Sequence, residues 1–252
     1  MKYLVGDIGN TLTKISLLNS NYRIIKSSNI ETQKLKNNNN LKIFFNKTLK
    51  KNLQKKILFS SVVPFIFKNI NTYLKKKNFE ALEIKKLHIK KIIDIRITNF
   101  NQLGSDRIAN AIASFYKYKK NCIIIDFGTA TTFDIVKSTG EYIGGVIAPG
   151  VKLSIINLKK NTSLLPVIEL RSKSKNYGKN TKDAINAGFL WGYQGLINNI
   201  IKKISNNGKI NYKIILTGGY ANLFKKYINK KSVVDKDITI KGIIQIYKKL
   251  IK

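Results

Sequence analysis

The chain has 252 residues, 43% of them hydrophobic, and a formal net charge of +34 at pH 7. A hydrophobic fraction of this size in a chain of this length predicts one large or two packed domains and excludes global disorder. The single cysteine, Cys122, excludes a disulfide framework and a thiolate metal cluster, and we expect it to be a buried small hydrophobe.

The positive charge favours nucleic acid as a partner, but the way it is distributed argues against a specific one. Nearly all of the excess is lysine spread over the whole chain, whereas arginine occurs only four times. Arginine is the usual reader of bases and phosphates because its planar fork binds at two points. The lysines accompany abundant Asn and Ile, as a compositional drift would produce without selection for a ligand. We therefore expect nonspecific attraction to nucleic acid and no specific nucleic-acid partner.

The only histidine, His88, lies in a lysine-rich stretch, where a surface position is favoured over a place in a catalytic triad. No apolar run is long enough to span a bilayer, and the N-terminus enters a strand without the pattern of a signal peptide. We expect no membrane association and a cytoplasmic location.

The first half of the chain begins with a buried strand at residues 2–8, which carries an acid, Asp7, just before a small-residue turn. Two further strands after this turn predict an antiparallel meander. Residues 33–53 are rich in Asn and Lys and predict a poor helix with a loop at Asn37–Asn40. The next predicted elements are a strand closed by Pro64, a helix to about Lys77, a strand at 83–89 and a helix from Ser105.

The helix from Ser105 has the clearest periodicity in this half. We expect Ser105 or Asp106 to cap its first turn. Apolar residues recur at the i, i+3, i+4, i+7 spacing of one buried face, at Ile108, Ala111, Ile112 and Phe115.

The second half repeats the opening pattern, with a strand that carries Asp126 near its end, a Gly/Thr turn and two more strands. A helix led by Gly150 follows, and residues 181–204 predict the longest helix. A late strand ends in a Gly-Gly turn, and an amphipathic helix closes the chain. The residues expected along one side of the longest helix are Ile185, Phe189, Gly192, Leu196, Ile200 and Ile204.

The two halves resemble each other as an internal repeat. Placing Asp7 on Asp126 puts Gly9 on Gly128 and Thr13 on Thr132, and Ile15 falls on Ile135 if one residue of slip is allowed. The repeat predicts a duplicated α/β architecture with a cleft between the halves. We place the domains at 1–115 and 116–252.

Both turns have the composition that a nucleotide phosphate requires. Glycine allows backbone N–H groups to approach closely, small hydroxyls add donors, and a carboxylate holds the cation that neutralises the phosphate. The stretches DIGNT and DFGTATT each provide all three, and Lys14 adds a positive charge to the first. A plain hairpin would explain one such turn. Two turns in register, together with TGG at 217–219, favour nucleotide binding.

A third group of residues lies in LGSDR, where Gly104 allows close backbone approach and Asp106 and Arg107 begin a helix. A carboxylate here can accept a proton from an alcohol, and Arg107 attracts an anion. From spacing alone, an N-cap with a surface arginine explains the same residues. GVIAPGVKLS at 145–154 approaches a P-loop but departs from it, and the absence of G-x-G-x-x-G leaves a dinucleotide site unsupported.

Seven stretches occur in order across nearly the whole chain: GDIGNT, SSVVP (60–64), LGSDR, DFGTATT, GGVIAPG (144–150), GKNTKDAINAG (178–188) and LTGGYA (216–221). Together they resemble the type III pantothenate kinases of the acetate and sugar kinase/Hsp70/actin-like superfamily. The resemblance implies two RNase H-like halves of mixed sheets flanked by helices, with the site in the cleft. It implies transfer of the γ-phosphate of ATP to the terminal hydroxyl of pantothenate, the first step to coenzyme A. It also implies Mg²⁺, a monovalent cation (K⁺ or NH₄⁺) and a homodimer with the pantothenate pocket near its interface.

The resemblance also implies a role for each matching residue. Asp106 would be the general base, Asp126 would hold the monovalent cation, and Asp7 would lie near Mg²⁺ and bind it through water. Pantothenate would be bound by Gly104, Ser105, Asp106, Arg107 and Thr181. ATP and its phosphates would be bound by Asp7, Ile8, Gly9, Asn10, Thr11, Leu12, Thr13, Lys14, Thr129, Thr131, Gly218 and Gly219.

The chain departs from the family pattern just before LGSDR. The family commonly has Tyr-x-Asn-Pro there, whereas this chain keeps Asn99 but has Ile97 in place of Tyr and Phe100 in place of Pro. Gln102 replaces the acid two residues before the glycine. The resemblance therefore implies weaker pantothenate binding with the chemistry retained.

Two other functions remain open at this point. A nucleotide-binding regulator of the same fold, a transcription accessory protein without kinase activity, would explain the altered segment at Ile97 and Phe100. A nucleic-acid-binding module would explain the charge, and it predicts a basic stripe on one face and steeply salt-dependent binding.

Overall fold

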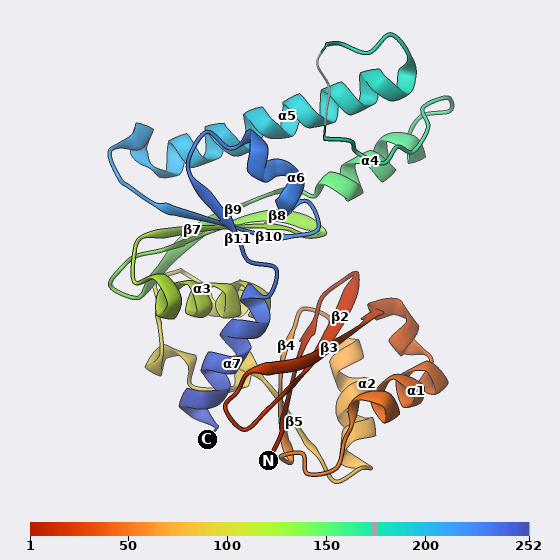
Figure 1. The fold of residues 1–252 in the computed structure, drawn as a ribbon, viewed down its shortest axis with the longest axis vertical. Coiled ribbons are helices and arrows are strands. Elements are labelled where there is room, and N and C mark those ends of the chain that lie inside the picture. The colour runs from red at the N-terminus through yellow and green to blue at the C-terminus, as the bar shows by residue number, and fades with distance from the viewer. Residues whose placement is uncertain (173–175, 252) are drawn as a thin grey trace. The chain divides into compact units, whose positions relative to one another are not determined.

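The computed structural model describes residues 1–172 and 176–251, which form two compact units by their internal contacts (Figure 1). Unit 1 comprises Met1–Lys117, Gly140–Tyr142 and the chain from Asp237 onward. Unit 2 comprises Tyr118–Thr139 and Ile143–Lys236. The last helix of the chain therefore belongs with the first strands by its contacts.

Unit 1 is built on a five-stranded sheet of order β3-β2-β1-β4-β5. Its first three strands form the expected antiparallel meander, and β4 and β5 run parallel to β1. Figure 1 shows α1 and α2 on one side of this sheet and α7 on the other. The bounds are β1 Tyr3–Ile8, β2 Leu12–Leu18, β3 Ile24–Glu31, β4 Lys56–Ser61, β5 Glu80–Glu83, α1 Asn38–Thr48, α2 Pro64–Lys75, α3 Ser105–Tyr118 and α7 Ile238–Leu250.

The two faces of the unit 1 sheet differ in chemistry because side chains alternate along each strand. One face carries Leu4, Ile8, Ile15 and Phe59, which pack with apolar residues of α1 and α2 into a core. The opposite face carries Asp7, and it is contacted by α7. The acid of the first turn therefore lies on the face away from the α1/α2 core.

Unit 2 is built around strands of a six-stranded sheet of order β11-β10-β7-β8-β9-β6. The short strand β6 (Asp94–Ile95) pairs with Glu141 and Tyr142 at the start of β9, and these residues all belong to unit 1. Figure 1 shows α4, α5 and α6 on one side of the strands β7, β8 and β10. The bounds are β7 Cys122–Phe127, β8 Ala130–Val136, β9 Glu141–Pro149, β10 Lys213–Gly218, β11 Ser232–Val234, α4 Val151–Lys160, α5 Thr181–Ile204 and α6 Ala221–Phe224.

The core of unit 2 forms where α5 covers the sheet. Leu190, Ile197 and Ile201 of α5 pack against Ile123 and Ile214 of the central strands. Short 3-10 helices complete the described chain: η1 Thr32–Lys36, η2 Ile84–Lys86, η3 Ile89–Lys91, η4 Phe100–Gln102, η5 Asn206–Gly208 and η6 Lys225–Tyr227.

The sheet orders confirm the internal repeat. The series β3-β2-β1-β4-β5 in unit 1 corresponds to β9-β8-β7-β10-β11 in the six-stranded sheet. Strand register corrects the sequence alignment, however. Thr13 lies opposite Ile8, and its counterpart opposite Phe127 is Thr131, not Thr132. The one-residue difference between the halves lies in the turn itself.

Three other expectations need correction. Asn37 is the N-cap of α1 and accepts hydrogen bonds from the N–H groups of Asn39 and Asn40, so the asparagine run begins a helix and is no loop. The strand expected at 83–89 ends at Glu83 and is followed by η2 and η3. The buried stripe of α5 is rotated from the expected one, because Gly192 is exposed whereas Leu190, Tyr193 and Ile197 are buried.

Two single-residue expectations are confirmed. Cys122 is fully buried, and burial raises the pKa of its thiol to about 11, which makes it unreactive. His88 is exposed. Among the residues that the structure describes, no helix combines the length and apolar character needed to cross a bilayer.

Candidate active site

The first turn joins β1 to β2 and is held by a residue outside the motif. The Gly9 N–H donates to the Leu12 carbonyl over 3.1 Å, and a Cβ at Gly9 would lie 3.0 Å from that oxygen. The Thr32 hydroxyl donates to the Gly9 carbonyl over 2.6 Å, and the Thr32 N–H donates to the Thr11 carbonyl over 3.0 Å. Thr32 therefore fixes both ends of a turn whose tip, Asn10 and Thr11, is exposed.

Asp7 shares its face of the sheet with a lysine and a serine. Directly paired residues of neighbouring strands present their side chains on the same face. Asp7 pairs with Lys14 on β2 and with Ser60 on β4. The Lys14 ammonium forms an ion pair with Asp237, the residue before α7. The expected phosphate-binding cation thus already has a carboxylate partner within unit 1.

The end of β4 links the first turn to the LGSDR segment. The Val62 N–H donates to the Ile8 carbonyl over 3.1 Å, and the Ser105 hydroxyl donates to the Ser61 carbonyl over 3.2 Å. The SSVVP stretch therefore lies between the first turn and the start of α3. Asp7 to Lys14 and Gly104 to Arg107 are in this way assembled within one unit.

Asp106 lies in the first turn of α3, folded back over Gly104. A Cβ at Gly104 would lie 2.4 Å from Asp106 Oδ1, which explains the glycine. The Arg107 N–H donates to Asp106 Oδ1 over 2.8 Å. Burial raises the pKa of the Asp106 carboxyl, although this hydrogen bond and the charge of Arg107 lower it in part. A carboxyl with a raised pKa beside an arginine suits a general base.

We expected Ser105 or Asp106 to cap α3, but the Ser105 side chain does not. The Gly104 carbonyl accepts the first helical bond, from the Ile108 N–H. The Ser105 hydroxyl also contacts Glu83 Oε1 at 2.5 Å, and Glu83 Oε2 accepts from the Lys85 N–H over 2.8 Å. Burial raises the pKa of Glu83. Sequence reasoning missed Glu83, because the end of β5 carries no motif.

Two glycines approach the second turn closely, Gly218 at Asp126 and Gly150 at Thr129. Thr217 pairs with Asp126 and Gly218 with Phe127 across β10 and β7. Gly218 has φ +84°, and a Cβ there would lie 2.5 Å from the Phe127 carbonyl oxygen and 2.7 Å from Asp126 Oδ1. A Cβ at Gly150 would lie 2.0 Å from the Thr129 carbonyl oxygen. Only glycine permits these approaches at the acid.

The Gly219 N–H donates to the Phe127 carbonyl over 3.1 Å, so the TGG turn is fixed beside the second turn. Thr129 is exposed. Gly150, which approaches it, precedes α4 and is an N-cap without a side chain that could occupy the helix N–H groups. Such groups attract an anion.

Thr131 and Thr132 lie on opposite faces of the second hairpin. Thr131 is fully buried opposite Phe127, and its hydroxyl has no hydrogen-bond partner among the described residues. Thr132 pairs with Asp126 and so shares its face, as Lys14 shares that of Asp7. Register identifies Thr132, which sequence reasoning did not select.

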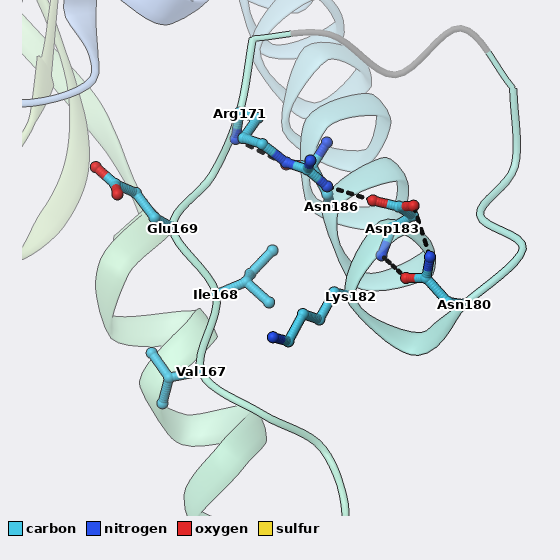
Figure 2. A pocket seen from close by; sticks show the side chains of 8 residues that line it. All are labelled: Val167, Ile168, Glu169, Arg171, Asn180, Lys182, Asp183 and Asn186. Atoms are coloured by element: carbon cyan, nitrogen blue, oxygen red, sulfur yellow. Dashed lines mark hydrogen bonds and ion pairs between the residues drawn. The ribbon is translucent and has the colours of Figure 1, made fainter.

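Thr181 is the first residue of α5, beside a hollow of about 400 Å³ (Figure 2). Asn180 caps the helix by accepting from the Asp183 N–H over 2.9 Å, and Asp183 forms an ion pair with Arg171. The residues that line the hollow are Val167, Ile168, Glu169, Arg171, Asn180, Lys182, Asp183 and Asn186.

A family model described as type III pantothenate kinase matches residues 3–203. A relative from Pelagibacter ubique (strain HTCC1062), named a type III pantothenate kinase, is 48% identical over 244 residues, which cover 96% of this chain and 97% of the relative. The chain belongs to the type III pantothenate kinase family.

Solved structures show the fold of this family member. A protein from Sinorhizobium meliloti described as a 2-dehydro-3-deoxygalactonokinase aligns with a TM-score of 0.62 at 9% identity, covering 98% of each chain. A protein from Campylobacter jejuni described as a Baf family transcriptional activator aligns with a TM-score of 0.57 at 21% identity, covering 97% of each chain. At these identities the likeness concerns the fold alone, which is that of the actin-like ATPases and sugar kinases.

As a pantothenate kinase the protein is a phosphotransferase with ATP as co-substrate and a divalent metal. The described residues contain no cluster of three or more His, Cys, Asp or Glu side chains that could enclose a metal. Magnesium in kinases is held by one or two carboxylates together with phosphates and water, so it needs no such cluster. Asp7, at the end of β1 beside the first turn, fits this requirement.

The segment before Gly104 is held by local polar contacts. Asn99 accepts from the Asn101 N–H over 3.0 Å, and Lys85 donates its ammonium to the Asn101 carbonyl over 2.7 Å. These contacts fix η4, which begins at Phe100.

The raised pKa of Asp106 predicts a stability effect. A carboxyl whose folded-state pKa is raised binds its proton more tightly when folded, so its stabilising contribution is present below the unfolded pKa and is lost as pH rises through the folded pKa. Asp106→Asn has no charge to desolvate and should be more stable than wild type at pH 7, with the difference vanishing in acid. Denaturant unfolding across pH measures this.

Asp183→Asn is the control of opposite sign, because hydrogen bonds from Asn180 and Arg171 lower the pKa of Asp183. This variant should be slightly less stable than wild type at neutral pH. An Asp106→Asn variant that is destabilised at pH 7 would contradict the assigned burial of the Asp106 charge.

Proposed function

We propose that this chain phosphorylates the terminal hydroxyl of pantothenate with Asp106 as the general base. The observation that supports this assignment is the assembly within unit 1. The end of β4 bonds to the first turn through Val62 and to the start of α3 through Ser61. The carboxylate that accepts the proton and the turn that would bind phosphate are thereby fixed to the same strand.

In this mechanism the chain contributes mainly positioning and electrostatics. The Asp106 Oδ atoms orient the alcohol and take its proton as its oxygen attacks the γ-phosphorus in line, while the bond from this phosphorus to the bridging oxygen breaks and ADP leaves. Arg107 attracts the carboxylate of pantothenate. The exposed tip of the first turn, Asn10 and Thr11, holds the phosphate oxygens, whereas the Thr13 hydroxyl is buried against Thr32 and only supports the turn. A magnesium ion held at Asp7 supplies charge neutralisation of the phosphates when bound.

The same assignment gives the second turn the monovalent cation and the nucleotide. We propose that Asp126 binds K⁺ or NH₄⁺, with Thr132 sharing its face, and that Gly218 and Gly219 lie near the nucleoside. Support comes from the close approach of Gly218 to Asp126 Oδ1 and of Gly150 to Thr129. A cation at Asp126 would lower the repulsion between phosphate and the protein carboxylate.

A homodimer formed through unit 2 completes the proposal, with Thr181 near the pantothenate pocket. Apolar side chains stand exposed on this unit, including Leu164 at 91% and Trp191 at 43% exposure. Aromatic side chains such as Trp191 are enriched at protein–protein interfaces. A cytoplasmic location follows for an enzyme of coenzyme A synthesis. Nothing in the described residues favours the regulator alternative.

The base assignment predicts that Asp106→Asn loses turnover while it retains ATP binding. We expect kcat to fall about 10²- to 10⁴-fold, because the amide cannot accept the proton. Pantothenate-dependent ADP release measures turnover, and calorimetry with Mg-ATP measures binding. Near-normal kcat in the folded variant would refute the base role, and a wild-type chain without pantothenate-dependent ADP release would refute the function.

The cation assignment predicts that wild type is more active in K⁺ than in Na⁺ and that Asp126→Asn loses this preference. We expect the K⁺ concentration for half-maximal rate to rise at least about tenfold. Asp94→Asn, which removes an exposed carboxylate paired with Arg96, is the matched control and should keep the wild-type K⁺ response. An unchanged response in Asp126→Asn would contradict the assignment.

A further inference from the structure

Lys14 is the one basic side chain of the first turn, and a residue from the opposite end of the chain holds it. Its ammonium forms an ion pair with Asp237 Oδ1 across a separation of 223 residues. Lys14 keeps 23% of its side chain exposed and Asp237 keeps 42%. The pair is therefore open to solvent, where a ligand can reach it.

Asp237 is fixed in place by the helix that follows it. Its carbonyl accepts the first helical bond of α7, from the Lys241 N–H over 2.9 Å. Further along α7, a Cβ at Gly242 would lie 1.9 Å from the Ala109 carbonyl oxygen, so α7 packs backbone to backbone on α3. Near its end, Tyr247 donates its hydroxyl to the Lys56 carbonyl over 3.0 Å.

The aromatic residues at this end of α7 also contact β1. The ring of Tyr247 meets the ring of Tyr3 edge-on at 5.5 Å between centroids. The helix is thus anchored on β1, β4 and α3, and its N-cap residue, Asp237, directs its carboxylate toward Lys14. The carboxylate belongs to a rigid frame within unit 1.

Stability does not account for this pair. Solvent-exposed ion pairs contribute little to stability. Holding lysine in one conformer costs side-chain entropy, which is a loss on folding but an advantage if the ammonium must meet a ligand in a set position. Lys14 faces the same side of the sheet as Asp7, beside the turn proposed to bind phosphate.

We propose that Asp237 is a positioning residue for phosphoryl transfer, which holds the Lys14 ammonium ready for the phosphates of ATP. This inference rests on the proposed function, in which Lys14 contacts those phosphates. Asp237 itself contacts no reacting atom. It acts through Lys14, so its effect should disappear when Lys14 is replaced.

A double-mutant cycle on kcat/KM for ATP tests this proposal. The variants are Asp237→Asn, Lys14→Met and the two combined, with Asp94→Asn as the matched control for loss of an ion-paired carboxylate in unit 1. We expect Asp237→Asn to lower kcat/KM for ATP about tenfold and to leave KM for pantothenate unchanged. In the Lys14→Met background the same change should have almost no further effect.

Asp237→Glu should restore part of the loss, because it returns the carboxylate. Thermal unfolding of every variant separates this coupling from damage to α7, which would lower the melting temperature and affect both substrates. The proposal would be overturned if Asp237→Asn lowered kcat/KM for ATP by the same factor in the wild-type and Lys14→Met backgrounds. A lower KM for ATP in Asp237→Asn would also overturn it. If Lys14→Met keeps wild-type kinetics while wild type is active, the positioning role is refuted although the kinase function stands.

Discussion

The structure depends on the pairing of an acid-bearing strand end with two neighbours. In unit 1, Asp7 lies opposite Lys14 on an antiparallel strand and Ser60 on a parallel one. In unit 2, Asp126 lies opposite Thr132 and Thr217 in the same arrangement. Since paired residues share a face, the strand register alone places polar side chains beside each carboxylate.

Glycine is the second part of this constraint. A Cβ would lie 2.7 Å from Asp126 Oδ1 at Gly218, 2.0 Å from the Thr129 carbonyl oxygen at Gly150 and 2.4 Å from Asp106 Oδ1 at Gly104. Such distances are shorter than real Cβ contacts. In the proposed function the acids beside these glycines hold the cations that offset the charge of a phosphate. The same geometry that fixes the turns therefore prepares them for a nucleotide.

Much of this could be predicted from the sequence, because the deciding signals are local. The acid-and-glycine turns, the helix from Ser105 and the bounds of α5 at 181–204 follow from spacing and capping residues. The buried stripe of α5 could not be predicted as well, since apolar residues occur around most of this helix. The prediction of a strand at 83–89 was wrong because a lysine-rich alternating pattern does not distinguish a strand from short helical turns.

The residues that support the site were beyond sequence reasoning for a different reason. Thr32, Glu83 and Asp237 act through partners 19 to 223 positions away, and nothing in their neighbours marks them. Only pairing and packing in three dimensions identify such contacts. The first-turn residues were found by composition, whereas the residues that hold them were found by geometry.

A crystal structure with magnesium and a non-hydrolysable ATP analogue tests the central claim most directly. We expect the triphosphate to contact the exposed tip of the first turn, Asn10 and Thr11, with a metal beside Asp7. A triphosphate bound away from this turn, or a metal away from Asp7, would contradict the proposed function.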